Sequence, residues 1–320
     1  MTPSIDQLKA AIVEEGIVDT HYHVGPELIP RKYNVATLAG AIKRCNATVV
    51  LKNHTYSTTP LAAIGRHEFN ANMIGSIVLN KFVGGLNVEA VRAAISGNKA
   101  NVQAENNESD PPFIVWMPTV HAQSHIAHLG FDFDPRWSGC CLPTRKEKTK
   151  DEPQQGIPVF DEKGQPVVEC IAILESIAAN KLILATGHLS AQEIMRLVPI
   201  ALEIGVPSVI LTHPSYPSVA LNNAQLKELT RSDRVFIEHC LAIHTIEEVP
   251  ITEFVESIKF TGPEQVLCST DFGQIFSQPF PEGTFSFVDQ LYKQLSHYLN
   301  QRDFVNLFTG TGRRALLINN

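Results

Sequence analysis

The chain alternates short, almost continuously apolar runs with longer segments in which hydrophobic residues recur at helical spacing. Apolar runs rich in β-branched residues are typical of parallel strands that are buried on both faces. The segments between them carry helix signals, as in residues 190–205, where Ser190 and Glu193 form a capping box and Gly205 marks the end. Eight apolar runs follow one another, at residues 16–23, 47–54, 73–81, 113–122, 181–188, 207–213, 234–239 and 265–271.

Strands that alternate with helices predict βαβ units, and eight such units predict an α/β fold of the (β/α)8 TIM-barrel type. A doubly wound open sheet is the competing architecture. We predict the barrel, as one domain over residues 1–320. A long insertion, residues 120–156, follows the fourth run, and the alternating pattern of residues 157–169 then predicts a β-hairpin around Gly164. A loop of this length at the carboxyl end of a barrel strand predicts a lid or a binding loop.

The composition narrows the classes of partner. The 320 residues are 44% hydrophobic with a net charge of −7 and no dense basic run, so we expect no nucleic-acid partner. No apolar run reaches the ~18 residues of a membrane span, and the N-terminal segment lacks the apolar core of a signal peptide, so we expect no membrane partner. The six cysteines show no CxxC pairing and read as reduced thiols of a cytoplasmic protein. The expected partner is a small molecule, and the sequence is compatible with a homo-oligomer.

Polar side chains close almost every apolar run. In one barrel, the carboxyl ends of all strands lie at the same rim, which is where barrels of this kind carry their active sites. Residues i and i+2 of a strand share a face, so His21 and His23 lie side by side, and so do Lys52 and His54. A set rich in imidazole suits zinc, manganese, iron or nickel better than calcium or magnesium. The residues at the run ends are His21, His23, Lys52, His54, His188, His213, Glu238, His239 and Asp271.

The ordered set of motifs resembles the amidohydrolase superfamily of metal-dependent hydrolases. "DTHYH", "ATGH", "LTH" and "STD" are similar to its HxH after strand one, its histidines after strands five and six, and its aspartate after strand eight. The closing "NLFTGTGRRALL" also resembles the last helix of that superfamily, and "HYHVGP" with "VLKNH" is similar to a poorly characterised branch. The resemblance implies one or two divalent ions, zinc first and manganese, iron or nickel as alternatives. It implies as their ligands His21, His23, His188, His213 and Asp271.

The chain departs from the superfamily at the bridging ligand. Many members with two metals use a carboxylated lysine after strand four, but residues 113–122 contain no lysine. The available lysine is Lys52, after the second run. It either becomes a carboxylated metal ligand or remains an ammonium group that grips a substrate carboxylate or carbonyl. His121 either takes the ligand position after strand four or contacts substrate. One metal ion and two metal ions are therefore both compatible with the sequence.

The resemblance also implies a reaction, in which a metal-activated hydroxide hydrolyses a small, cyclic amide, imide or lactone. Asp271 would accept the proton of the attacking water and pass it to the leaving group. His188 or His239 would stabilise the oxyanion. Glu238 and His239 are neighbours that cannot both face the centre of the rim, and we expect His239 to face it. The candidate substrate contacts are His54, Arg31, Tyr33 and His121.

Other functions stay open at this point. A metal-dependent decarboxylase or another lyase would use the same ligands, and a phosphoesterase is a third enzyme class. A non-catalytic metal-binding barrel would tolerate the loss of Asp271, so the presence of that residue beside a full ligand set favours an enzyme. His121, His125 and His128 share one helical face, which is either a solvated loop face or a face near the metal.

Overall fold

The computed structural model describes residues 3–99, 110–130, 134–138 and 155–318. The centre of the insertion, residues 139–154 with Cys140 and Cys141, lies outside the described residues, so the lid expected there stays a prediction. None of the helices in the described part of the chain is both long and apolar enough to cross a membrane.

The strands pair in parallel, in the order in which they follow one another in the chain. They are β1 (Val18–His23), β2 (Thr48–Lys52), β3 (Asn72–Ile74), β4 (Ser76–Val78), β5 (Ile114–Trp116), β6 (Ile183–Ala185), β7 (Ser208–Thr212), β8 (Val235–Cys240) and β9 (Val266–Ser269). β1 to β3 form one hydrogen-bonded sheet, and β4 to β9 form the other.

The third predicted strand is present in two pieces, β3 and β4, which are separated at Gly75. A Cβ atom at Gly75 would lie 2.5 Å from the Cα atom of Thr59, at the start of α3 (Thr59–Phe69). The helix therefore approaches the strand too closely there for any larger residue. With β3 and β4 counted together, all eight apolar runs form the strands that the sequence predicts.

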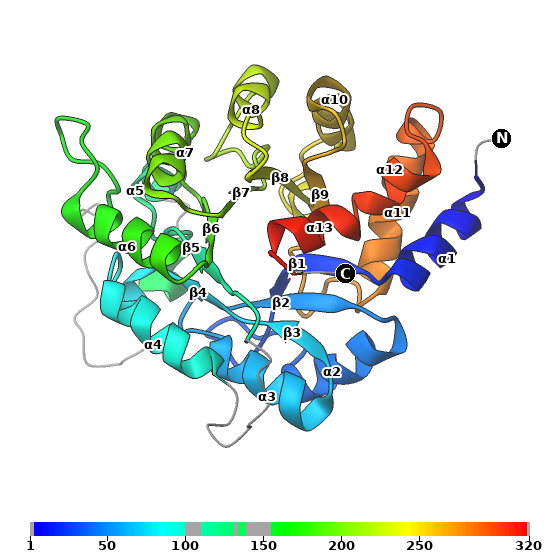
Figure 1. Cartoon of the computed structure of the whole chain (residues 1–320), viewed down its shortest axis with the longest axis horizontal. Helices are drawn as coiled ribbons and strands as arrows, with labels where there is room; N and C mark the ends of the chain where they lie inside the picture. Colours follow the sequence, from blue (N-terminus) through cyan, green and yellow to red (C-terminus); the bar gives the residue numbers. More distant parts are fainter. Residues whose placement is uncertain (1–2, 100–109, 131–133, 139–154, 319–320) are drawn as a thin grey trace.

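The two sheets meet at both edges. On one side, the side chain of Ser76 in β4 donates a hydrogen bond of 2.6 Å to the carbonyl of Leu51 in β2. On the other side, the backbone N–H of Asp271, just after β9, donates to the carbonyl of His21 in β1 at 2.8 Å. These contacts join the strands into the predicted (β/α)8 barrel rather than an open sheet (Figure 1).

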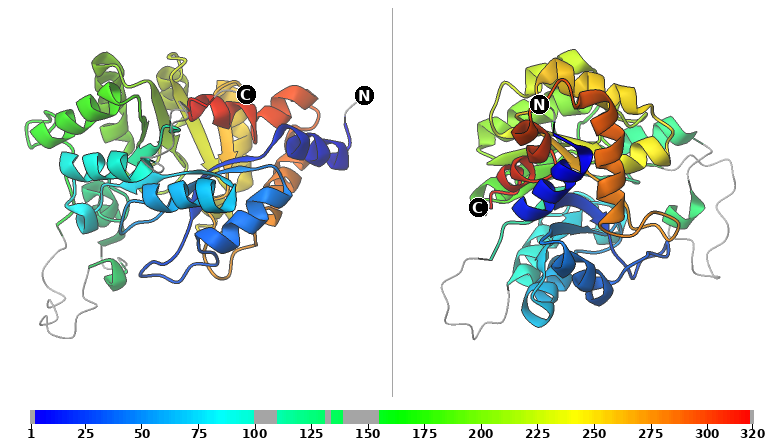
Figure 2. Two further views of the ribbon diagram at one scale, coloured as in Figure 1. Left: turned by 60° about the horizontal axis from the view of Figure 1, so that its bottom comes forward. Right: turned by 90° about the vertical axis from the view of Figure 1, so that its right-hand side faces the viewer.

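Helices surround the strands, as both views of Figure 2 show. In α7, the predicted capping box is confirmed, because Ser190 accepts from the backbone N–H of Glu193 and Gly205 ends the helix with a φ of 100°. Besides α3, the helices are α1 (Ile5–Glu15), α2 (Val35–Arg44), α4 (Val88–Asn98), α5 (Gln123–Leu129), α6 (Val168–Ala179), α7 (Ala191–Ile204), α8 (Asn223–Leu229), α9 (Leu241–Thr245), α10 (Ile251–Thr261), α11 (Glu282–Leu295), α12 (Gln301–Asn306), α13 (Gly310–Ala315) and the 3-10 turns η1 (Lys81–Val83) and η3 (Pro135–Ser138).

The predicted hairpin after the insertion is a tight antiparallel turn. Phe160 and Pro166 form a single antiparallel bridge, and the N–H of Val167 donates to the carbonyl of Val159 at 3.1 Å. Gly164 supplies the positive φ, 76°, that the turn needs. Proline has no N–H to donate to a ladder, so Pro166 keeps the pairing from growing into two full strands.

Candidate metal centre

The barrel brings most of the predicted polar residues together at the carboxyl ends of the strands. β1 delivers His21 and His23, which are 0% and 3% exposed, and β2 delivers Lys52, which is 1% exposed. Asp271 follows β9, the neighbour of β1, and its side chain is 13% exposed. The prediction that His21 and His23 share one face is confirmed, because both side chains reach the same carboxylate.

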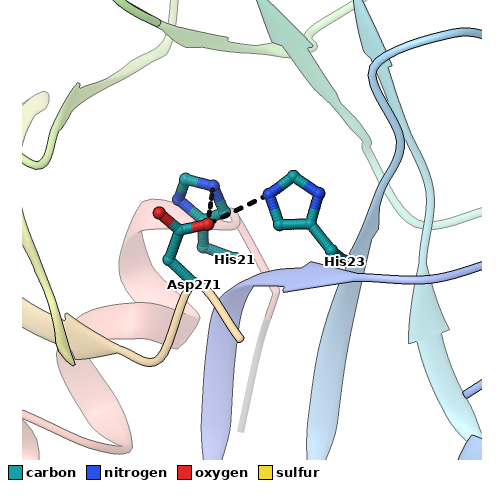
Figure 3. A group of neighbouring side chains, drawn as sticks. All are labelled: His21, His23 and Asp271. Carbon is teal, nitrogen blue, oxygen red and sulfur yellow. Dashed lines mark ion pairs between the residues drawn. The ribbon is translucent and has the colours of Figure 1, made fainter. Parts of the chain in front are cut away.

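Asp271 lies between the two histidines of β1 (Figure 3). The Nε2 atoms of His21 and His23 each lie 3.0 Å from the same oxygen, Oδ1 of Asp271. Donor atoms at this separation fit ligands of one ion with bonds of about 2.0–2.2 Å. His21, His23 and Asp271 are thus the residues that the geometry places best for holding a metal.

The charge balance around Asp271 supports this fit. Burial would raise the pKa of Asp271, but His21 and His23 hold it well below its usual range. Burial would likewise lower the pKa of His21, but the carboxylates of Asp271 and Glu238 raise it. The space between the Nε2 atom and the carboxylate therefore favours a positive charge, which a bound cation would supply.

Glu238 holds the other side of the His21 ring. Its Oε2 atom lies 3.0 Å from Nδ1 of His21, and its Oε1 atom accepts a hydrogen bond from the hydroxyl of Thr20. That hydroxyl also lies 2.6 Å from the hydroxyl of Ser269. A carboxylate can only accept here, so Nδ1 of His21 donates and Nε2 faces Asp271.

His239 does not reach the cluster, and the expectation that it faces the centre of the rim is wrong. Its Nε2 atom lies 3.2 Å from the hydroxyl of Ser257, and its ring stacks on Phe254 at 4.8 Å, both in α10. Burial lowers the pKa of His239 to about 3. Side chains alternate along β8, so once Glu238 faces His21 its neighbour must face the helix.

Lys52 also lies against His21, as expected for the lysine after the second run. Its Nζ atom is 2.7 Å from Nε2 of His21 and 4.1 Å from the centre of the Trp116 ring. Burial lowers the pKa of Lys52, although Asp271 and Glu238 oppose the shift. The amine is therefore close enough to serve as a ligand or to contact a bound substrate.

Imidazole rings continue from this point around the rim in an unbroken arc. Successive ring centres are separated by 4.7, 5.6, 5.8, 5.0 and 4.5 Å. The arc, which we call the histidine arc, consists of His54, His23, His21, His213, His188 and His125. His188 and His213 therefore lie close to His21, as predicted, and His125 of α5 extends the arc beyond them.

His188 and His213 differ from His21 because the described residues offer no hydrogen-bond partner to their buried Nδ1 atoms. Burial lowers the pKa of His213 to about 3 and that of His188 well below its ordinary value, so both rings are neutral. Neutral imidazoles are the form that binds metals. The ring of Tyr216 covers both, with centres 5.1 Å from each.

Two strand-end residues of this centre have unusual backbone. His213 and Asp271 have φ values of 28° and 53°, in a region that side chains other than glycine seldom adopt. Strained positions of this kind cluster at functional sites, where the surrounding structure holds them in place.

Among the four predicted substrate contacts, His54 lies closest to the centre. Its ring packs against His23, its Nδ1 atom lies 3.0 Å from the hydroxyl of Thr119, and Trp137 of η3 covers it at 4.9 Å. His121 is in the next layer outward, because its Nε2 atom lies 2.8 Å from the carbonyl oxygen of Trp137.

The other two predicted contacts, Arg31 and Tyr33, lie in different places. Arg31 is buried and forms an ion pair with Glu27 beside His54. Tyr33 packs against Tyr22 at 6.2 Å, on the face of β1 opposite to the histidines. The structure therefore brings Arg31 to the centre and does not bring Tyr33.

Comparison with known structures shows the class of fold. The probable dipeptidase PvdM from Pseudomonas aeruginosa is similar with a TM-score of 0.53 and 9% identity, over 98% of this chain and 97% of that one. An amidohydrolase from Pseudomonas aeruginosa is similar with a TM-score of 0.50 and 11% identity, over 98% of both chains. A 2,6-dihydroxybenzoate decarboxylase, solved with 2,6-dihydroxybenzoate, is similar with a TM-score of 0.50 and 11% identity, over 95% of this chain and 99% of that one. These likenesses show a shared barrel fold, which is the fold that the resemblance to the amidohydrolase superfamily implied.

The sequence also matches a family. Residues 16–238 match the model of a family of unknown function, DUF6282, and the chain belongs to that family. No curated protein matches the sequence.

Proposed function

We propose that the chain is a metal-dependent hydrolase of a small, cyclic amide, imide or lactone. The observation that carries the proposal is the approach of two histidine Nε2 atoms to one Asp271 oxygen, each at 3.0 Å, at the rim of an amidohydrolase barrel. The neutral rings of His188 and His213 are available as further ligands, so the site accommodates one or two ions. Nitrogen and oxygen donors of this kind favour zinc, with manganese, iron or nickel as alternatives.

Asp271 has the position of a proton carrier. A bound divalent ion would lower the pKa of water from ~15.7 towards ~7 and polarise a carbonyl. Oδ1 of Asp271 makes both histidine contacts, so Oδ2 is the oxygen left to accept a proton from the attacking water. The same carboxyl group would then pass the proton to the leaving nitrogen or oxygen.

Lys52 has two alternative roles in this proposal. Its buried amine, 2.7 Å from Nε2 of His21, is either a carboxylated metal ligand or an ammonium group for the substrate. Replacement by alanine distinguishes them, because short-chain carboxylic acids would restore part of the lost activity only if a carbamate had been removed. Growth with labelled bicarbonate and carbon NMR of the wild-type protein would detect the carbamate directly.

Elemental analysis and a substrate panel test the proposal together. Protein purified without chelators should hold at least one transition-metal ion per chain, and it should open one class within a panel of lactams, imides and lactones. Asp271→Asn should lower that turnover by ~10²-fold or more. Less than a tenth of an equivalent of metal after reconstitution, or ring opening that is independent of Asp271, would overturn the proposal.

A metal-dependent decarboxylase is the second candidate. A structural neighbour with this reaction in its name has the same barrel, although the likeness concerns the fold alone. Products distinguish the two reactions, since hydrolysis incorporates oxygen from labelled water whereas decarboxylation releases carbon dioxide. Release of carbon dioxide without incorporation of label would favour the lyase.

A further inference from the structure

The loop between β1 and α2 places a buried arginine next to the candidate metal centre. The side chain of Arg31 is 4% exposed and that of its partner Glu27 is 0% exposed. Nε of Arg31 donates to Oε2 of Glu27. An isolated antiparallel bridge with Gln274 ties the backbone of Arg31 to the loop after β9. The guanidinium group is thus held in place from two directions.

Glu27 fixes the distance between this arginine and the histidines. Its other oxygen, Oε1, accepts a hydrogen bond from the backbone N–H of His54. A carboxylate oxygen of Glu27 and ring nitrogens of His23 and His54 all lie within 4.8 Å of one another. Arg31 is therefore separated from His23 by a single carboxylate group.

Most of the donors of Arg31 remain unused. Nη1 and Nη2 have no acceptor among the residues that the structure describes, and neither is among the fully buried side-chain atoms that lack a partner. The Nη edge is therefore open to a ligand, although the side chain is only 4% exposed. Burial is the larger cause of the low pKa of His23 and His54, and the charge of Arg31 lowers both further, which agrees with its place beside the two rings. A guanidinium group that is largely removed from water gains more from an anionic acceptor than an exposed one does, so a site of this kind favours a ligand that accepts from Nη1 and Nη2.

We propose that the Nη edge of Arg31 binds a carboxylate group of the substrate. Because Glu27 occupies Nε, the free Nη1 and Nη2 atoms form the flat, two-pronged edge that matches a carboxylate. The enclosed position suits a compact, planar anion. The inference refines the proposed function, on which its catalytic meaning rests: the substrate is a small acid whose reacting carbonyl lies over the metal while its carboxylate lies on Arg31.

Calorimetric titration of the zinc-loaded protein tests the site without relying on catalysis. The probes are glutarate and its neutral diamide, glutaramide, which has nearly the same size. The wild-type protein should bind glutarate at least ~10-fold more tightly, as expected for charge-assisted hydrogen bonds. Equal affinity for the two probes would overturn the inference before any variant is made.

Variants then assign the preference to Arg31. Arg31→Met should reduce the affinity for glutarate by ~10- to 100-fold and Arg31→Lys by less, whereas affinity for glutaramide should hardly change. Arg92→Met is the matched control, because Arg92 forms an exposed pair with Glu89 on α4. Unchanged glutarate binding in Arg31→Met would overturn the inference.

Removal of Arg31 leaves Glu27 buried without its partner, so circular dichroism and zinc content accompany each titration. If Arg31→Met does not fold, the double variant Glu27→Gln/Arg31→Met removes both charges and decides the matter by the same criterion. The outcome is separate from that of the proposed function. Binding of glutarate that depends on Arg31, in a protein that hydrolyses nothing, would support the acid site and refute the hydrolase.

Discussion

The two flanks of the histidine arc satisfy their ring nitrogens in different ways. On the flank of β1, His21 lies between the carboxylates of Glu238 and Asp271, and His23 shares the second of these. On the flank of β6 and β7, no carboxylate of the described residues forms an ion pair with His188 or His213, and their Nδ1 atoms, like that of His23, have no partner among the described residues. One flank is therefore organised by acids before any ligand arrives, and the other is not.

The difference indicates a division of labour. Acids around His21 fix the orientation of its ring and strengthen its attraction for a cation. Neutral rings without acids bind a cation more weakly, but they leave open the positions that a second ion or a substrate oxygen would take. The first flank would then set metal affinity, and the second would set what else the centre accepts.

Replacement of Asp271, the acid that both histidines of β1 contact, should have the largest effect. Asp271→Asn should lower kcat/KM by ~10²-fold or more, because the amide cannot carry a proton. Folding should survive, since asparagine tolerates the left-handed backbone, φ 53°, at this position. Steady-state kinetics and thermal unfolding measure both effects, with Asp289→Asn, in a half-buried ion pair with Lys9 away from the candidate centre, as the control. Near-normal turnover would refute the role of Asp271.

Replacement of His188 and His213 tests whether the flank of β6 and β7 binds metal. His188→Asn and His213→Asn should each weaken the binding of zinc by at least ~10-fold, or remove one of two ions, since loss of a ligand costs at least as much as loss of its supporting partner. Competition with a fluorescent chelator measures the affinity, and His67→Asn, on the exposed face of α3, is the control. Unchanged zinc binding in both variants would restrict the metal to His21, His23 and Asp271.

The neighbours Glu238 and His239 provide an internal control for the role of the acids around His21, on the flank of β1. Glu238→Gln should lower zinc affinity by ~10- to 100-fold, because the amide presents an N–H group or a weaker acceptor to Nδ1 of His21. His239→Gln should leave zinc affinity unchanged, because His239 faces α10. The same chelator competition serves both variants. An equal effect of the two variants would mean that zinc affinity does not depend on which face of β8 a side chain occupies.

The smallest expected effect concerns the stability of the metal-free protein at low pH. Burial lowers the pKa to about 3 for His213 and His239 and to about 4 for His121 and His125, below the ordinary 6.5 of the unfolded chain. Between these values the unfolded state binds more protons, so stability falls as the pH falls below 6.5. The pKa of Asp19, raised to about 6, and the raised pKa values of His21, Glu27 and Glu247 act in the opposite direction, but the pKa values of seven histidines are lowered.

Urea unfolding at several pH values between 7.5 and 5 measures this slope. His239→Gln removes one of these histidines without touching the candidate metal centre, and it should reduce the slope by up to about 1.4 kcal/mol per pH unit. A slope that stays the same in the variant would mean that His239 is protonated in the folded protein. An increase in stability on acidification would contradict the whole set of lowered pKa values.

The eight strands and the convergence of polar residues at their carboxyl ends could be predicted because both depend on short-range patterns. Parallel strands buried on two faces are apolar throughout, and a polar residue that ends such a run has few places to go except the rim. The pair His21 and His23 also followed from the two-residue repeat of a strand. These features are present in the local sequence and need no knowledge of packing.

The wrong predictions concern side-chain directions and loop contacts that only packing decides. Glu238 and His239 follow the same apolar run, and nothing in that run distinguishes the face towards the barrel from the face towards α10. The partners of Arg31, Tyr33 and His121 are set by loops that meet only after the barrel has closed, as when Trp137 covers His54. Pro166 limited the hairpin to a turn, which the alternating pattern around it concealed.

The candidate metal centre lies where the first strand of the barrel meets the last. The hydroxyl of Thr270, next to Asp271, donates to the carboxylate of Asp19, two residues before His21, across 251 positions of the chain. During synthesis on the ribosome, His21 and His23 leave the exit tunnel long before Asp271 does. The donor set of His21, His23 and Asp271 therefore cannot assemble until the strand before Asp271 has been made, and tight metal binding would report that the barrel has closed.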